Sequence, residues 1–176
     1  MEKKIWRVGS VGIGGISRGV HLPGIEKSPD LQLVAVCDIR PERMEYAREK
    51  YGIDEAHCFA DYHDLINCPD VDVIDISTSN NAHFEVAKAA IEAGKPYAIE
   101  KPVTMTAEEA DILARMTAEK NLKNMVCFSY RFKAAARSGT CPGLGATSRS
   151  LQGPARWETW GVMPWIWSAL SPGKTM

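Results

Sequence analysis

Two hydrophobic periods alternate along the first 132 residues of the chain, and this alternation restricts the fold more than any other feature. Short apolar runs typical of β-strands occur six times, in "KIWRVGSVG", "LQLVAVCD", "HCFA", "VDVIDIS", "PYAIE" and "NMVCFSYRF". Helical patterns separate them, in "SRGVHLPGIEKS", "RPERMEYAREKYG", "DYHDLINC", "AHFEVAKAAIEAG" and "TAEEADILARMTAEKN". Strands that alternate with helices of this length form βαβ units and hence a parallel sheet.

The runs from Leu31 to Val36 and from Val71 to Ile76 are apolar almost throughout. Such strands are typical of a parallel sheet that helices cover on both faces. We therefore predict an α/β fold of the Rossmann type, with a doubly wound parallel sheet of six strands in the order 3-2-1-4-5-6. Gly52 and Gly94 stand where two of the helices should end.

The composition changes after Phe132. The last 44 residues (176 − 132) contain one of the 22 acidic residues, Glu158, and four of the five tryptophans. Gly, Ala, Ser and Pro fill 21 of these 44 positions, and neither hydrophobic period continues. We predict a dinucleotide-binding domain at 1–132 and an irregular tail at 133–176, with disorder in the polar, Gly/Pro-rich half of the tail.

Charge and composition argue against several classes of partner. The net charge is −1 and no basic block occurs, so nucleic acid is not an expected partner. No apolar run approaches the length of a membrane span, and the N-terminus does not resemble a signal peptide. The five cysteines show no spacing typical of a metal site, so no metal is expected, and their odd number and scatter predict a reducing cytoplasm. They are Cys37, Cys58, Cys68, Cys127 and Cys141.

A glycine-rich turn, "VGIGGIS", connects the first strand to the first helix. Gly12 and Gly14, with Ser17 in the third place, match the dinucleotide-binding fingerprint. Gly12 permits a tight turn, and Gly14 allows the backbone to approach a pyrophosphate near the N–H groups of the following helix. The alternative is a structural glycine turn that binds no ligand.

An acidic residue, Asp38, ends the second strand 24 residues after Gly14. Its carboxylate can accept hydrogen bonds from the adenosine ribose and repel a 2′-phosphate, which favours NAD over NADP. Arg40 and Arg43 weaken this argument, because either guanidinium could pair with a phosphate, so NADP remains possible. For Arg43, an exposed helix position is the simpler interpretation.

Polar side chains follow the fourth strand, at the edge where such sheets bind ligands. Ser77, Thr78 and Asn80 are short enough to reach the ribose and phosphates of a cofactor. His83 begins the next helix. It is either a structural residue at that helix start or a neighbour of the cofactor.

Several of these segments together resemble the N-terminal half of the Gfo/Idh/MocA (glucose–fructose oxidoreductase/inositol dehydrogenase) family. The resemblance covers residues 4 to 132 and is carried by "GIGGI", "HLPGI", Asp38, "STSNNAH", "AIEAGKPYAIEKP" and "FSYRF". Glu100-Lys101-Pro102 is its most specific element. The chain departs from the family pattern at Ser79, where the family often has proline.

The resemblance implies an NAD(P)-dependent oxidoreductase that acts on sugars, cyclitols or related compounds. It implies that Lys101 positions the substrate and relays a proton, that Glu100 approaches the nicotinamide, and that the peptide bond before Pro102 is cis. The alternative for Glu100 and Lys101 is a surface ion pair. The full predicted cofactor-binding set is Gly12, Gly14, Gly15, Ile16, Asp38, Arg40, Ser77, Thr78, Asn80, His83, Glu100, Lys101 and Pro102.

Members of the family continue with a second α/β domain, which holds the substrate, supplies an acid/base histidine and usually forms the oligomer interface. Residues after Phe132 do not resemble it, and the last histidine is His83. We therefore expect a truncated or frameshifted chain that binds nicotinamide dinucleotide but is catalytically incomplete. It would act on a sugar-like substrate only if a second domain were supplied, and it should self-associate through exposed apolar surface.

Two alternatives have different consequences. The chain could be a non-catalytic, dinucleotide-sensing or scaffold protein whose Trp-rich tail binds a partner. It could also be a full enzyme that a separate chain completes. A real short tail is likewise the alternative to a frameshift.

Overall fold

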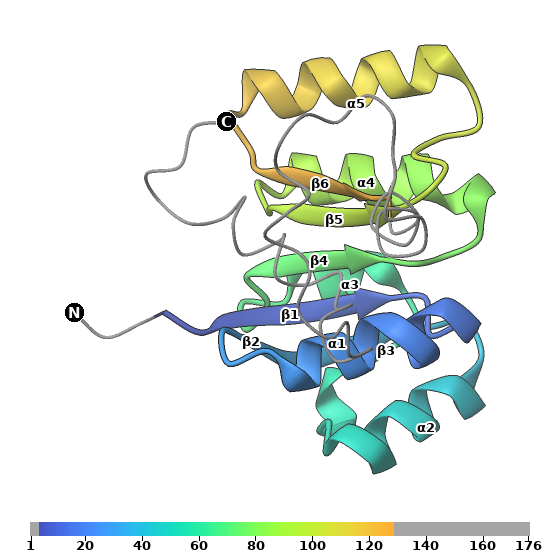
Figure 1. The fold of residues 1–176 in the computed structure, drawn as a ribbon, viewed down its shortest axis with the longest axis vertical. Helices are drawn as coiled ribbons and strands as arrows, with labels where there is room; N and C mark the ends of the chain where they lie inside the picture. The colour runs from blue at the N-terminus through green and yellow to red at the C-terminus, as the bar shows by residue number, and fades with distance from the viewer. Residues whose placement is uncertain (1–3, 129–176) are drawn as a thin grey trace, which may run out of the picture.

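The computed structural model describes residues 4–128, and the predicted tail at 133–176 lies outside the described residues, as do Cys141 and the end of the predicted domain. The described residues form a six-stranded sheet in the order β3-β2-β1-β4-β5-β6, and every neighbouring pair is parallel. This confirms the predicted fold class and strand order (Figure 1).

The elements follow the predicted alternation. The strands are β1 (Trp6–Val11), β2 (Leu31–Cys37), β3 (Cys58–Phe59), β4 (Val73–Ile76), β5 (Tyr97–Glu100) and β6 (Asn124–Cys127). The α-helices are α1 (Leu22–Lys27), α2 (Pro41–Tyr51), α3 (Tyr62–Asn67), α4 (His83–Glu92) and α5 (Ala107–Glu119). Three shorter helices precede α1, β3 and α4: η1 (Ser17–His21), which is a π-helix, and the 3₁₀ turns η2 (Glu55–His57) and η3 (Asn80–Ala82).

Two hydrophobic layers enclose the sheet. On one face, α1 and α2 pack through Leu22, Ile25 and Ala47 against alternate residues of the strands, among them Val8 and Val36. On the other face, α3, α4 and α5 pack against the intervening strand residues, and α4 is the most deeply buried of the helices. Burying both faces explains why the strands are apolar nearly throughout.

Helix ends follow local chemistry. Pro41 occupies the first turn of α2, where its missing N–H removes no hydrogen bond. Gly52 ends α2 in the left-handed region (φ 68°), and its N–H donates to the carbonyl of Arg48 at 2.9 Å. At the start of α5, the Thr106 hydroxyl accepts from the N–H of Glu109 at 3.2 Å. The predicted stop at Gly52 is thus confirmed.

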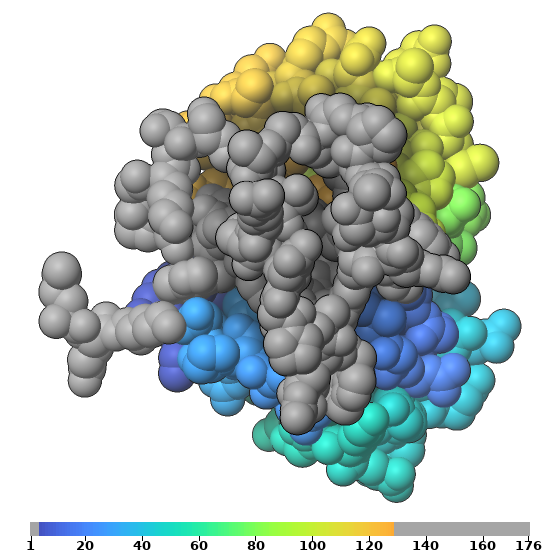
Figure 2. All heavy atoms as spheres, in the orientation of Figure 1, coloured from blue at the N-terminus to red at the C-terminus, as the bar shows by residue number. Residues whose placement is uncertain are grey.

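The described part of the chain is longest in the direction that runs across the strands of the sheet. Figure 2 shows the yellow residues of α5 at the top of the molecule and the cyan-to-teal residues of α2 at the bottom. Within residues 4–128, no helix combines the length and the apolarity that crossing a membrane requires.

Candidate functional site

Four predicted site residues lie together at the carboxyl ends of the strands. The register pairs Val11 with both Cys37 and Ile76, and Ile76 with Ile99. The residues that follow these four, namely Gly12, Asp38, Ser77 and Glu100, therefore meet at one edge of the sheet. In doubly wound sheets, ligands bind at this edge.

Gly12 connects β1 to both neighbouring strands. Its N–H donates to the Cys37 carbonyl at 2.8 Å, and its carbonyl accepts from the Ser77 hydroxyl at 2.7 Å. Its φ is 91°, and a Cβ at this position would lie 2.7 Å from the carbonyl oxygen of Ser77 and from the amide nitrogen of Thr78. Only glycine fits here, because a side chain would meet the neighbouring backbone.

The next residues of the turn are open. A Cβ added at Gly14 or Gly15 would meet no heavy atom within 4 Å, and the Ile16 side chain is exposed. A phosphate group could therefore approach the backbone at this turn, as the fingerprint predicts. The Ser17 hydroxyl is buried and has no hydrogen-bond partner among the described residues.

The helix after the turn begins as the π-helical segment η1, and Leu22 N donates to the carbonyl of Ser17, five residues back. Pro23 lies just beyond and has no N–H to donate to Gly19, which removes one α-helical bond from this turn. The sequence predicted one continuous helix here. The wider turn places His21 over the sheet, fully buried.

Asp38 is held in place by backbone amides. Its Oδ2 accepts from Ile13 N at 2.7 Å, and its Oδ1 accepts from Arg40 N at 2.9 Å. Arg43 Nη1 lies 3.3 Å from Oδ2, so Arg43 occupies a helix position as expected, but its side chain is 29% exposed and paired with Asp38 and is not simply solvated. Arg40 contacts Asp38 through its backbone, and its side chain is exposed. A carboxylate has about four acceptor positions, so Asp38 retains capacity for a ribose hydroxyl.

The residues after β4 differ in their surroundings. Ser77 is buried against Gly12, Thr78 is half-buried, and Asn80 is exposed at the start of η3. His83 is buried at the first position of α4, and its Nδ1 donates to the Pro102 carbonyl at 2.6 Å. His83 Nε2 is buried and has no partner in the described part of the chain. His83 therefore connects α4 to the turn after β5.

That turn contains the predicted motif, and its Lys101–Pro102 peptide bond is cis, as expected. Glu100 is buried and points inward: its Oε1 lies 3.1 Å from His21 Nε2, and its Oε2 accepts from Lys101 N at 3.1 Å. Lys101 Nζ lies 3.6 Å from Glu100 Oε2, and the Lys101 side chain is 48% exposed. A simple surface ion pair is therefore the wrong description of the motif, because only the lysine faces solvent.

Sequence reasoning missed the buried partners of Glu100. His21 Nδ1 lies 2.8 Å from Asp75 Oδ1, and the Ser10 hydroxyl donates to Asp75 Oδ2 at 2.9 Å. Asp75 interrupts an otherwise apolar strand, which was the available signal, since a buried acid needs a partner. The identity of that partner depends on which strands are neighbours.

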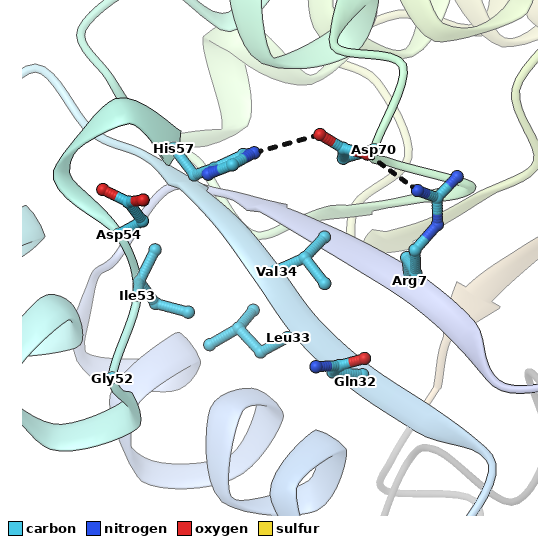
Figure 3. A pocket seen from close by; sticks show the side chains of 9 residues that line it. All are labelled: Arg7, Gln32, Leu33, Val34, Gly52, Ile53, Asp54, His57 and Asp70. Atoms are coloured by element: carbon cyan, nitrogen blue, oxygen red, sulfur yellow. Dashed lines mark hydrogen bonds and ion pairs between the residues drawn. The ribbon is translucent and has the colours of Figure 1, made fainter.

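A separate hollow lies at the opposite end of the sheet (Figure 3). Arg7, Gln32 and Val34 line it from β1 and β2, and His57 Nε2 lies 3.3 Å from Asp70 Oδ2 across it. It contains none of the predicted site residues. We do not assign the cofactor to it, because doubly wound sheets bind ligands at the carboxyl ends of their strands.

Comparisons with known proteins agree with this geometry. The family model GFO_IDH_MocA, described as "Oxidoreductase family, NAD-binding Rossmann fold", matches residues 6–128. The inositol 2-dehydrogenase of Salmonella typhimurium is 46% identical over 126 residues, which cover 70% of this chain and 36% of that protein. The chain thus spans about a third of the length of this curated relative.

Solved structures show the same similarity. The scyllo-inositol dehydrogenase from Lactobacillus casei with bound NAD(H) and scyllo-inositol has a TM-score of 0.70 and 27% identity, over 76% of this chain and 39% of that one. A 3-ketoreductase from Actinomadura kijaniata in complex with TDP-benzene and NADP has a TM-score of 0.67 and 26% identity, over 76% and 43%.

Proposed function

The chain belongs to the GFO_IDH_MocA oxidoreductase family and carries its NAD-binding Rossmann domain, and we propose that it binds the dinucleotide across the carboxyl ends of β1, β2, β4 and β5. The observation that carries the proposal is the turn from Gly12 to Ile16. It is closed against β4 at Gly12 and open to solvent above Gly14 and Gly15. A backbone of this shape accommodates a pyrophosphate where side chains would obstruct it.

NAD is the preferred cofactor in this proposal. Asp38 directly follows β2, where the adenosine ribose binds in this fold, and the charge of its carboxylate disfavours a 2′-phosphate. The guanidinium of Arg43 already pairs with Asp38. A structural neighbour binds NADP, so we expect discrimination between the two cofactors and not exclusion of NADP.

The turn after β5 supplies the reactive end of the site. A nicotinamide bound there would supply the chemistry of hydride transfer to or from a substrate carbon. The exposed ammonium group of Lys101 is suited to orient a substrate hydroxyl and to relay its proton, while the buried carboxylate of Glu100 orients Lys101. Thr78, Asn80 and His83 contribute to cofactor binding from the end of β4 and the start of α4.

We further propose that the chain by itself is catalytically incomplete. In the family that the chain resembles, the acid/base histidine and the substrate-holding sheet belong to a second domain, and residues 4–128, the part of the chain that the structure describes, form the Rossmann domain. Lys101 without these groups can neither position a sugar hydroxyl nor exclude water from it. The substrate class, sugars and cyclitols, is proposed from the relatives.

Fluorescence titration with NADH tests cofactor binding. We expect saturable binding, weakened about tenfold or more by Asp38→Ala, which corresponds to about 1.4 kcal/mol. The matched control is Asp54→Ala, which removes an acidic cap at the opposite end of the sheet and should leave binding unchanged. Absence of saturable binding up to about 1 mM, the upper end of common cofactor affinities, would contradict the proposal.

Turnover assays test the second part. With NAD and a panel of inositols and aldoses, the purified chain should show no rate above background. Steady turnover that Lys101→Ala abolishes would show that the chain contains a complete catalytic site.

A further inference from the structure

Four side chains that carry polar or titratable groups lie on one face of the sheet beneath η1. They are Ser10, Asp75, Glu100 and Cys127. Side chains alternate between the faces of a strand, so Ser10 shares a face with Val8, Asp75 with Val73, and Glu100 with Ala98. This is the face that α1 covers. The register pairs Ser10 with Asp75 and Glu100 with Cys127, which brings the four residues together.

His21 lies between two carboxylates of this group. Its Nδ1 is 2.8 Å from Asp75 Oδ1 and its Nε2 is 3.1 Å from Glu100 Oε1, and the ring is fully buried. A neutral imidazole donates from one nitrogen only, so it would present a lone pair to the second carboxylate. An imidazolium donates from both nitrogens and satisfies both carboxylates.

The electrostatics agree with the geometry. Burial alone lowers the pKa of His21, but the Asp75 and Glu100 carboxylates outweigh it and raise the pKa to about 10. Burial acts to raise the pKa of Glu100, but hydrogen bonds from His21 and from Lys101 N outweigh it and the pKa is lowered.

Cys127 is the remaining titratable group on this face. Its thiol lies near His21 and Glu100, with the three ligand atoms within 4.8 Å of one another. Burial and the nearby carboxylates raise the pKa of Cys127, so the thiol keeps its proton. Since a metal needs the thiolate and a free imidazole lone pair, an ion pair describes this cluster better than a metal site.

The cluster extends to the surface through Glu100. One carboxylate oxygen faces His21, and the other accepts from the N–H of Lys101 and approaches its ammonium group. The orientation of the Glu100 carboxylate therefore determines where the Lys101 backbone and ammonium group lie.

We propose that His21 is the positioning residue of the Glu100-Lys101-Pro102 turn: as an imidazolium anchored on Asp75, it holds the Glu100 carboxylate inward, and Glu100 in turn holds Lys101 at the cofactor-binding edge. This role rests on the proposed function only in its last step, the contact with the cofactor. The protonation of His21 and its hold on Glu100 are properties of the chain alone.

The first experiment measures the protonation state directly. Two-bond ¹H–¹⁵N spectra of ¹⁵N-histidine-labelled chain, assigned by His21→Gln, should show both His21 nitrogens protonated up to about pH 9, well above the usual range for histidine. A single neutral tautomer at pH 7.5 would overturn the proposal.

The second experiment separates positioning from folding. His21→Gln alone leaves two buried carboxylates without a cation, so the test variant is His21→Gln/Asp75→Asn, which removes one charge of each sign. We expect this variant to bind ADP-ribose within about twofold of the parent and NADH about tenfold more weakly, because only NADH reaches the turn after β5. Equal retention of both affinities would overturn the proposal.

The control is His57→Gln/Asp70→Asn, the same pair of substitutions at the contact between His57 and Asp70 in Figure 3. It should leave the affinities for ADP-ribose and NADH unchanged, and also the rate at which the Lys101 amide hydrogen exchanges with solvent.

Amide hydrogen exchange tests the positioning role of His21 even if the parent binds neither ADP-ribose nor NADH and the proposed function is therefore wrong. Because Lys101 N donates to Glu100, its exchange rate should then still rise about fivefold or more in His21→Gln/Asp75→Asn, while that of Ile99 in β5 stays constant. An unchanged Lys101 rate would overturn the positioning role by itself.

Discussion

At the scale of single residues, two glycines of the same turn have different physical tasks. Gly12 is required by the fold, since its φ is 91° and a Cβ would meet the backbone of Ser77 and Thr78. Gly14 has open space around it, so the absence of a side chain there serves an incoming group and not the fold. The fingerprint pattern alone does not distinguish these two reasons.

Alanine substitutions should separate the two tasks. Gly12→Ala should destabilise the chain by about 2–4 kcal/mol, from left-handed backbone strain plus the clash with the backbone of Ser77 and Thr78. Gly14→Ala should change stability by less than about 1 kcal/mol and weaken NADH binding severalfold, because its methyl group occupies the approach to the backbone. Urea unfolding and NADH titration of both variants check this, and equal effects on stability would contradict it.

The buried cluster around His21 gives stability a specific pH dependence. The folded pKa of His21 is about 10 against 6.5, so its contribution is fully present below pH 6.5 and is lost as the pH rises toward 10. The folded pKa of Glu100 is lowered, so its contribution is present above about pH 4.5 and is lost on acidification. Both contributions are largest between these two limits.

We therefore expect the free energy of unfolding of the parent to fall by roughly 3–5 kcal/mol between pH 6.5 and 10, since one pKa unit corresponds to about 1.4 kcal/mol. In His21→Gln/Asp75→Asn the part of this fall below about pH 9 should be absent, and what remains should lie above about pH 9, where the buried thiols of Cys37 and Cys127 ionise in the unfolded chain. Urea titrations at several pH values measure the difference, and parallel pH profiles for the two proteins would contradict the expectation.

At the scale of elements, the sequence predicted the existence and order of the strands and helices, and the differences have local causes. β3 contains two residues, because it pairs only along Val36 and Cys37 at the edge of the sheet. The helix after the glycine turn begins as the π-helical η1, next to Pro23. Periodicity over a short window does not distinguish a π-turn from an α-turn.

The start of α5 provides a test at this scale. The Thr106 hydroxyl accepts from Glu109 N, and the Glu109 carboxylate accepts from Met105 N, so the segment after the motif is tied to the helix start. Thr106→Ala should cost about 1 kcal/mol of unfolding free energy, whereas Thr106→Ser should cost less than about 0.5 kcal/mol. Urea unfolding measures both, and an equal cost for both variants would exclude the cap as the cause.

At the scale of the whole molecule, the described residues leave several large apolar side chains in solvent. These are Ile5, Ile16, Ile39, Met105 and Phe128. Single exposed apolar residues are normal on a protein surface, whereas larger apolar areas mark contact sites. Self-association therefore stays a prediction that solution measurements must test.

We expect sedimentation velocity to show association that increases with concentration over about a hundredfold range. Replacing Ile5 and Met105 by Ser should weaken it, because both side chains are exposed and neither is among the proposed cofactor contacts. A single monomeric species at all concentrations would contradict the prediction.

The sequence by itself determined the α/β class, the strand order, the glycine turn and the candidate residues at the strand ends. These follow from local periodicity and turn chemistry, which act over a few neighbouring residues. Only the tertiary structure decided that Asp75 and Glu100 face one imidazole and that Arg43 pairs with Asp38. His21 is separated from its two partners by 54 and 79 positions, and the parallel register and the π-turn alone bring them together.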